Sequence, residues 1–135
     1  MIRDLVNGLK VEQTVYPQGL LADGADITGE SVNIVGFRRV AFAVLVGDYT
    51  SGEAAVTLQG QDEDGDWEAI DSGDIIEDIS VLADIDNDQE ESVLTFGLKT
   101  GKYQALRAIV DSGTGDGILD IAIAVLKSSK YNEPV

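Results

Sequence analysis

Two short acidic segments hold the residues of this chain that are best suited to chemistry, because closely spaced carboxylates supply the oxygen ligands that calcium prefers. Each segment has an Asp at every second position, a spacing that could gather several carboxylates around one ion. We therefore consider a divalent-cation site at each segment, with Asp62, Asp64 and Asp66 in the first and Asp84, Asp86 and Asp88 in the second.

Neither segment fits the EF-hand loop, which needs Gly at its sixth position and a bidentate Glu at its twelfth. A loop starting at Asp62 has Trp67 and Gly73 there, and a loop starting at Asp84 fails at the same two positions. We interpret the first segment as a solvated hairpin tip whose charges discourage edge-to-edge strand pairing. We expect no cofactor; a weak divalent site between subunits is the alternative that the second segment leaves open.

Catalysis has little support in the composition. The chain has no Cys and no His, which excludes disulfides, thiolate nucleophiles, catalytic triads and the commonest zinc ligand. Paired carboxylates could suggest a glycosidase, but such enzymes line a cleft with aromatic side chains, and this chain has one Trp, four Tyr and three Phe. We therefore expect a protein that is not an enzyme.

The charge of the chain also restricts its partners. No Lys or Arg lies between Arg39 and Lys99, whereas sixteen Asp and Glu residues lie from Asp48 to Glu91, and the net charge is -16. Such a surface repels nucleic acid and anionic lipid, so we expect neither a nucleic-acid nor a membrane partner.

We expect the strand residues Arg38, Arg39 and Arg107 to pair with carboxylates, and Trp67 to pack in the core.

A chain of 135 residues with 44% hydrophobic residues is long enough for one domain with its own core. The first residues lack the apolar stretch of a signal peptide, so we expect synthesis in the cytoplasm. Residues 1–30 are the least patterned part and predict either an extended N-terminal arm or a lid across the domain edge. Residues 31–135 predict a single β-sandwich domain.

Alternating and continuous apolar runs at short intervals predict strands, and no segment has a helical period over three turns. The fold class predicted is therefore all-β, an antiparallel, jelly-roll-like β-sandwich of about seven to nine strands. Arg39–Val46 is apolar on both faces and predicts a central strand buried on two sides. Ile75–Leu82 could be a strand or a helical turn. Further strands are expected near Val11–Val15, ended by Tyr16 and Pro17, and at 31–34, 54–59, 67–70, 92–98, 103–110 and 118–126.

Several segments, taken in order, resemble a family of small structural proteins encoded in the head-gene region of tailed phages and prophages. The resemblance is carried by a short strand closed by Gly and an aromatic residue, an apolar strand followed by Gly-Asp, and a strand that runs into an acidic Asp-Gly turn and a Trp. A further segment matches the family's tendency to an aromatic residue followed by an Arg in a strand. The resemblance covers roughly residues 30–135 and rests on Val32–Phe37, Val40–Val46, Val56–Trp67, Lys102–Ala108 and Ile121–Leu126, with the terminal Pro134 and Val135.

The resemblance implies a virion component on the head surface, most simply a capsid decoration (cement) protein that binds the major capsid protein of the mature shell. It also implies a homo-oligomer, with a trimer favoured. Two other functions remain open. One is a different virion part, such as a head–tail adaptor or a tail or fibre-base protein. The other is a calcium-dependent carbohydrate-binding β-sandwich.

In the decoration hypothesis, the N-terminal arm would face the shell or a neighbouring subunit, and the acidic turns would point outward. Apolar and aromatic residues of the arm would supply contact area, and its basic residues would meet acidic patches of the capsid. The expected contact residues are Arg3, Leu5, Val6, Lys10, Tyr16 and Leu20.

Overall fold

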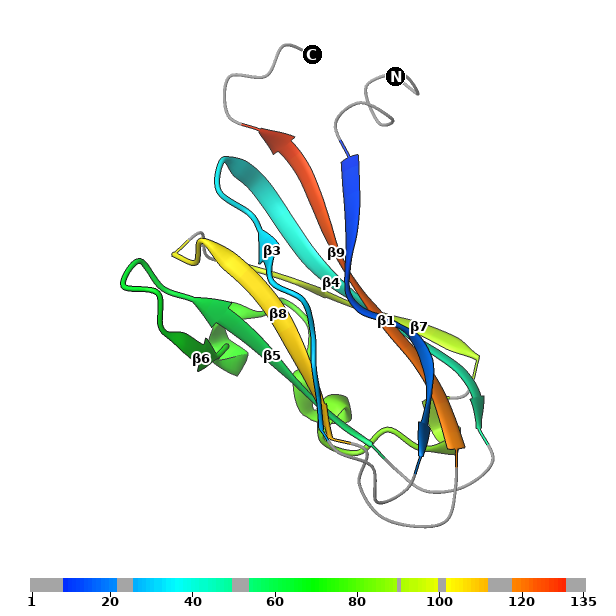
Figure 1. Cartoon of the computed structure of the whole chain (residues 1–135). Coiled ribbons are helices and arrows are strands. Elements are labelled where there is room, and N and C mark those ends of the chain that lie inside the picture. The colour runs from blue at the N-terminus through cyan, green and yellow to red at the C-terminus, as the bar shows by residue number, and fades with distance from the viewer. Residues whose placement is uncertain are drawn as a thin grey trace.

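The computed structural model of the chain describes residues 9–21, 26–49, 54–89, 91–99, 102–111 and 118–130. These residues form two antiparallel sheets that pack face to face (Figure 1). The four-stranded sheet has the order β1 (Leu9–Leu21), β9 (Ile118–Lys130), β4 (Phe37–Tyr49) and β7 (Ser92–Gly97). The five-stranded sheet has the order β2 (Ile27–Thr28), β8 (Ala105–Asp111), β5 (Ala55–Gln61) and β6 (Trp67–Ala69), and β3 (Val32–Asn33) also pairs with β8.

The predicted fold class is confirmed: the described residues form an all-β sandwich with nine strands and no α-helix. Alternation along each strand explains the sandwich, because every second side chain points between the sheets. The core contains Phe42 and Val44 of β4, Ile123 of β9, and Leu106 and Val110 of β8, each fully buried. Burying one such side chain stabilises the fold by about 1.5–3 kcal/mol.

The burial of β4 differs from one prediction. The strand lies between β9 and β7, as an inner strand should, but its second face is only partly buried. Leu45 on that face keeps 42% of its surface exposed, whereas Val44 and Val46 on the inner face are buried. The prediction of burial on both sides is therefore wrong for Leu45, because the sandwich has two layers and this face looks away from the other sheet.

The first strand is longer than predicted. The prediction that it ends at Tyr16 and Pro17 is wrong, since β1 continues to Leu21 and pairs with β9 along its length. Pro17 is tolerated because β1 is an edge strand whose register shifts between Val15 and Gln18, and an irregular edge can lack a hydrogen-bond donor. Within the region 1–30 predicted as an arm or lid, this segment is the edge strand of a sheet.

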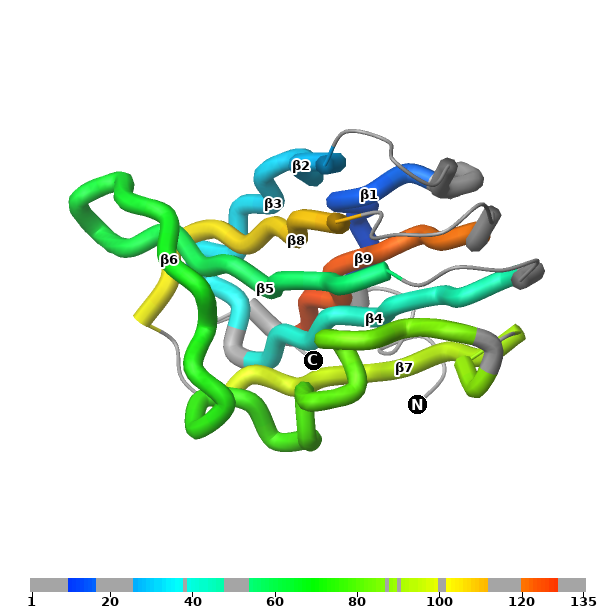
Figure 2. The backbone as a smooth tube through the Cα atoms, turned by 90° about the horizontal axis from the view of Figure 1, so that it is seen from below, coloured from blue at the N-terminus to red at the C-terminus, as the bar shows by residue number. Residues whose placement is uncertain are grey.

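The segment between β6 and β7 forms short helical turns instead of a strand. It contains the 3-10 helices η1 (Ser72–Asp74), η2 (Ile79–Ala83) and η3 (Asn87–Gln89). Figure 2 shows this segment, in green, crossing from β6 in one sheet to β7 in the other. Two short bridges attach it to the sheets, Ile75 with Leu98 and Ile85 with Ala54, and both isoleucines are buried.

The opposite side of the sandwich is joined by hydrogen bonds around Thr14. Its hydroxyl donates to the carbonyl oxygen of Glu30 at 2.7 Å and accepts from the backbone nitrogen of Ala108 at 3.2 Å. The Glu30 nitrogen in turn donates to the Thr14 carbonyl oxygen at 2.6 Å, and the Gly29 nitrogen donates to the Ala108 carbonyl oxygen at 2.8 Å. These bonds connect β1 of the four-stranded sheet to β8 of the five-stranded sheet.

Gly29 has no room for a side chain at this junction. A Cβ atom built there would lie 2.6 Å from the Thr14 carbonyl oxygen and 2.8 Å from that of Ala108, and also against the Thr14 hydroxyl. We expect Gly29→Ala to lower the free energy of unfolding by about 2 kcal/mol, because backbone atoms must move to admit the methyl group.

Gly73→Ala is the matched control, since nothing lies within 4 Å of a Cβ atom at Gly73. Urea unfolding of the two variants measures the difference. Equal stability of both variants would contradict the tight junction at Thr14.

Candidate interaction surfaces

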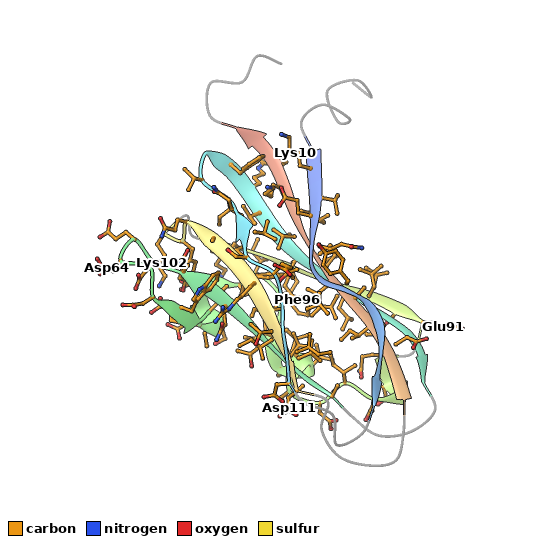
Figure 3. All side chains as sticks on the ribbon, in the orientation of Figure 1. Lys10, Asp64, Glu91, Phe96, Lys102 and Asp111 are labelled. Carbon is orange, nitrogen blue, oxygen red and sulfur yellow. The ribbon has the colours of Figure 1, made fainter. Side chains whose placement is uncertain are left out.

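The first acidic segment forms the tight turn between β5 and β6. The Asp62 carboxylate oxygen Oδ1 accepts hydrogen bonds from the backbone nitrogens of Asp64 at 2.9 Å and Asp66 at 3.0 Å. Gly65 has a φ of 90°, a left-handed conformation that Gly adopts without strain, and it allows the chain to reverse. Figure 3 shows Asp64 at the outer tip of this hairpin. The Asp62 carboxylate therefore stabilises the turn, which agrees with its interpretation as a hairpin tip.

The second acidic segment uses its carboxylates in the same way. Asp86 Oδ1 accepts from the Asp88 nitrogen at 2.9 Å, and the Asp86 nitrogen donates to Gln89 Oε1 at 2.9 Å. Asp84 ends η2, and its nitrogen donates to the Val81 carbonyl oxygen. Within the described residues, no three Asp or Glu side chains are placed to hold a metal ion. The alternative of a divalent site between subunits concerns a second chain and stays a prediction.

Trp67 and Arg107 form a small patch on the outer face of the five-stranded sheet. The Arg107 guanidinium lies 4.2 Å from the centre of the Trp67 ring, and Arg107 Nε donates to Gln59 Oε1 at 2.8 Å. The expected core position of Trp67 is wrong: the residue is half-buried and pairs with Gln61, whose side chain points away from the core. Arg107 contacts an indole and an amide, where a carboxylate partner was expected, and one face of the indole is occupied by a cation.

A groove of about 590 Å³ runs beside β1. Tyr16, with 56% of its surface exposed, and Val11 contribute apolar walls, and Glu12 and Glu30 contribute carboxylates. Gln13, Ser31 and Val32 complete the lining. The groove combines apolar and acidic side chains on the outermost strand of its sheet, where a partner could reach it.

The structure brings only some of the predicted contact residues to this region. Lys10 and Tyr16 are exposed on β1, and Figure 3 shows Lys10 near the start of that strand. Leu20 pairs through its backbone with Leu119, and its side chain is outside the described part. Arg3, Leu5 and Val6 also lie outside the described residues.

Lys127 is a polar residue of this region that the sequence analysis did not identify. Only 4% of its surface is exposed. Its Nζ atom lies 2.6 Å from Glu12 Oε1, 3.0 Å from the carbonyl oxygen of Asn33, and 4.8 Å from the centre of the Phe37 ring. A buried ammonium group needs such partners. The sequence indicates its burial through its position in the strand, because Lys127 comes two residues after Val125, which is buried on the same face.

Comparison with solved structures shows the same fold in a protein derived from the SPBc2 prophage, YomS. The similarity covers 90% of this chain and 93% of that chain, with a TM-score of 0.57 and 16% sequence identity. No protein-family description matches the sequence, and no curated protein matches it. The described residues contain no helix long and apolar enough to cross a membrane.

The use of carboxylates inside the turns predicts how the protein responds to calcium. We expect calcium and magnesium chloride at equal concentration to raise the melting temperature equally, because both cations screen the net charge of -16 without a specific site. A calcium site occupied at 100 times its Kd would instead add about 2.7 kcal/mol. Differential scanning calorimetry measures this comparison. A calcium-specific rise that Asp62→Asn abolishes would contradict the prediction.

Proposed function

We propose that this chain is a structural protein of a phage virion, a capsid decoration protein that binds the major capsid protein on the mature head surface. The observation that carries the proposal is the fold shared with a prophage-derived protein along 90% of this chain and 93% of the other. The ordered resemblance to small head-region proteins over residues 30–135 points to the same kind of virion component.

The arrangement of strands adds support. With β2 and β3 counted as one strand, the sheet orders follow those of a jelly roll, an architecture that occurs in viral capsid domains and in lectins. Both long sides of this sandwich are joined by hydrogen bonds, at Thr14 and at the Ile75 and Ile85 bridges. A surface held in this way loses little conformational entropy when it binds a shell. We propose no catalytic role, in keeping with the lack of Cys and His.

We propose that the capsid contacts the groove beside β1. Lys10, next to the groove-lining Val11 in β1, supplies a positive charge beside the groove. Tyr16 supplies an exposed aromatic ring of the kind that is enriched at protein interfaces. The acidic β5–β6 turn, with Asp64 at its tip, lies well away from Lys10 (Figure 3). In this orientation the acidic turn faces solvent and keeps decorated particles from aggregating.

Binding to capsid shells tests the proposed function. The purified protein is mixed with expanded shells that lack it, and with precursor shells, and the copies that sediment with each are counted. We expect saturable binding at high copy number to expanded shells and none to precursor shells, because cement stabilises only the state that it binds. A low copy number confined to one vertex would favour an adaptor, and no binding to either shell would contradict decoration.

Substitutions in and beside the groove test the proposed contact. We expect Tyr16→Ala and Lys10→Ala each to weaken shell binding by about fivefold or more, since loss of an anchoring interface side chain costs more than about 1 kcal/mol. Asp64→Ala, on the solvent-facing turn, is the control and should bind as the wild type does. Equal binding by all three variants would place the contact elsewhere on the molecule.

A further inference from the structure

The outer face of the four-stranded sheet carries three successive rows of uncharged residues. Residues directly opposite one another in neighbouring antiparallel strands point to the same face, so the strand register assigns the members of each row. The inner rows contain the buried Phe42, Val44 and Val46 of β4, which leaves the alternate residues on the outer face. These rows are Val11, Leu126, Ala41 and Gly97; Gln13, Ala124, Ala43 and Thr95; and Ala122, Leu45 and Val93.

The face is apolar enough to need an explanation. Val11, Leu45 and Val93 are exposed by 57%, 42% and 61%. Ile76, exposed by 62%, extends the face at its β7 edge, because its Cδ1 atom lies 3.0 Å from where a Cβ atom of Gly97 would be. The Glu77 carboxylate lies at the same edge, where its Oε1 accepts a hydrogen bond from the Gly97 nitrogen at 2.6 Å. Single exposed apolar side chains are ordinary, but three adjacent rows without a charged residue on a chain of net charge -16 mark an interaction surface.

Opposite charges stand at the two ends of this face. At one end lies Arg39 of β4, which pairs with Ser128 of β9. Lys99 lies at the same end, two residues after the end of β7. Both residues are exposed. At the other end Asp120 lies beside Gly47, at 3.1 Å from a Cβ atom built there, and the Glu91 nitrogen donates to the Gly47 carbonyl oxygen at 3.1 Å. Figure 3 shows Glu91 at the start of β7.

The charged ends are symmetric about the centre of the face. Ala43 of β4 pairs with Ala124 of β9, and Arg39 and Gly47 each lie four residues from Ala43 along β4. A two-fold axis that lies in the interface over this centre, perpendicular to the strands, therefore reverses the two ends. It brings the positive end of one molecule over the negative end of another, and it stacks the uncharged rows on each other.

We propose that this face binds a second copy of the same chain in a face-to-face, two-fold dimer. In the dimer, Arg39 and Lys99 approach Asp120 and Glu91 of the second copy, and the small side chains of Ala43 and Ala124 let the sheets come close at the centre. Stacked sheets pack about 10 Å apart, a spacing that these small residues allow. Arg39, Lys99, Asp120 and Glu91 cancel one another on each face, which reduces the repulsion between two acidic molecules.

The size of the face sets the strength of the contact. Four strands about 4.8 Å apart and nine residues at about 3.4 Å each cover on the order of 600 Å² per copy. A stable interface buries about 800 Å² per partner, so we expect a dimer that dissociates on dilution. The resemblance to head proteins favoured a trimer, whereas this self-complementary face favours a pair. The inference does not depend on capsid binding, because it concerns the purified protein alone.

Sedimentation velocity of the full chain over a range of concentrations tests the dimer. We expect the wild type to shift from monomer to dimer as its concentration rises, and Leu45→Lys to stay monomeric because it places a charge on the uncharged rows. Circular dichroism checks that the variant is folded, as expected for a substitution at an exposed position. A wild type that stays monomeric throughout, or that forms a trimer, overturns the proposal.

A charge-reversal cycle tests the orientation of the two copies. We expect Arg39→Glu and Asp120→Arg each to raise the dimer Kd by about tenfold or more, because each places like charges opposite one another. The double variant should return to within about threefold of the wild-type Kd, a difference small beside the tenfold losses. Asp64→Arg, remote from the face, makes the same change in net charge as Asp120→Arg and should leave the Kd unchanged. Failure of the double variant to restore the dimer overturns the proposed stacking.

Discussion

The hydrogen bonds around Thr14 are the constraint on which the rest of this sandwich depends. Strand β1 pairs on one side only with β9, and without further partners it would leave that side of the molecule open. Thr14 lies at a register shift, is almost fully buried, and satisfies polar atoms of Glu30 and Ala108. Buried polar atoms that lose their partners cost about 1–3 kcal/mol each, so this junction holds the two sheets in one arrangement.

Because β1 is held in this way, the surfaces next to it have a defined shape. The groove lined by Glu12 and Tyr16 lies between β1 and the start of β3, and the Lys127 ammonium ties Glu12 to the backbone of Asn33. The Asp residues of the β5–β6 turn hold their own backbone and project away from this region. The three central rows on the outer face of the four-stranded sheet carry no charged residue.

The fold class could be predicted from the sequence because alternation of apolar residues reports burial directly. The acidic hairpin turn could be predicted as well, since Asp62 and Gly65 act through local geometry. The Thr14 junction could not be predicted, because Thr14 and Ala108 are 94 residues apart and meet only after both sheets have formed. The same holds for Lys127, whose partners come from β1 and β3. Of the predicted contact residues, Lys10 and Tyr16 lie on the surface of β1, as polar and aromatic residues of an edge strand do.

Native-state hydrogen exchange of the Glu30 and Ala108 amides shows whether β1 is an integral strand of the sandwich. Both amides donate to Thr14, one to its carbonyl oxygen and one to its hydroxyl. If β1 is integral, both amides exchange only through global unfolding, with the same opening free energy as the amides that pair β4 with β9. Fast exchange of Glu30 and Ala108 while the β4 and β9 amides stay protected would mean that β1 detaches as an arm and that the Thr14 junction does not hold the two sheets together.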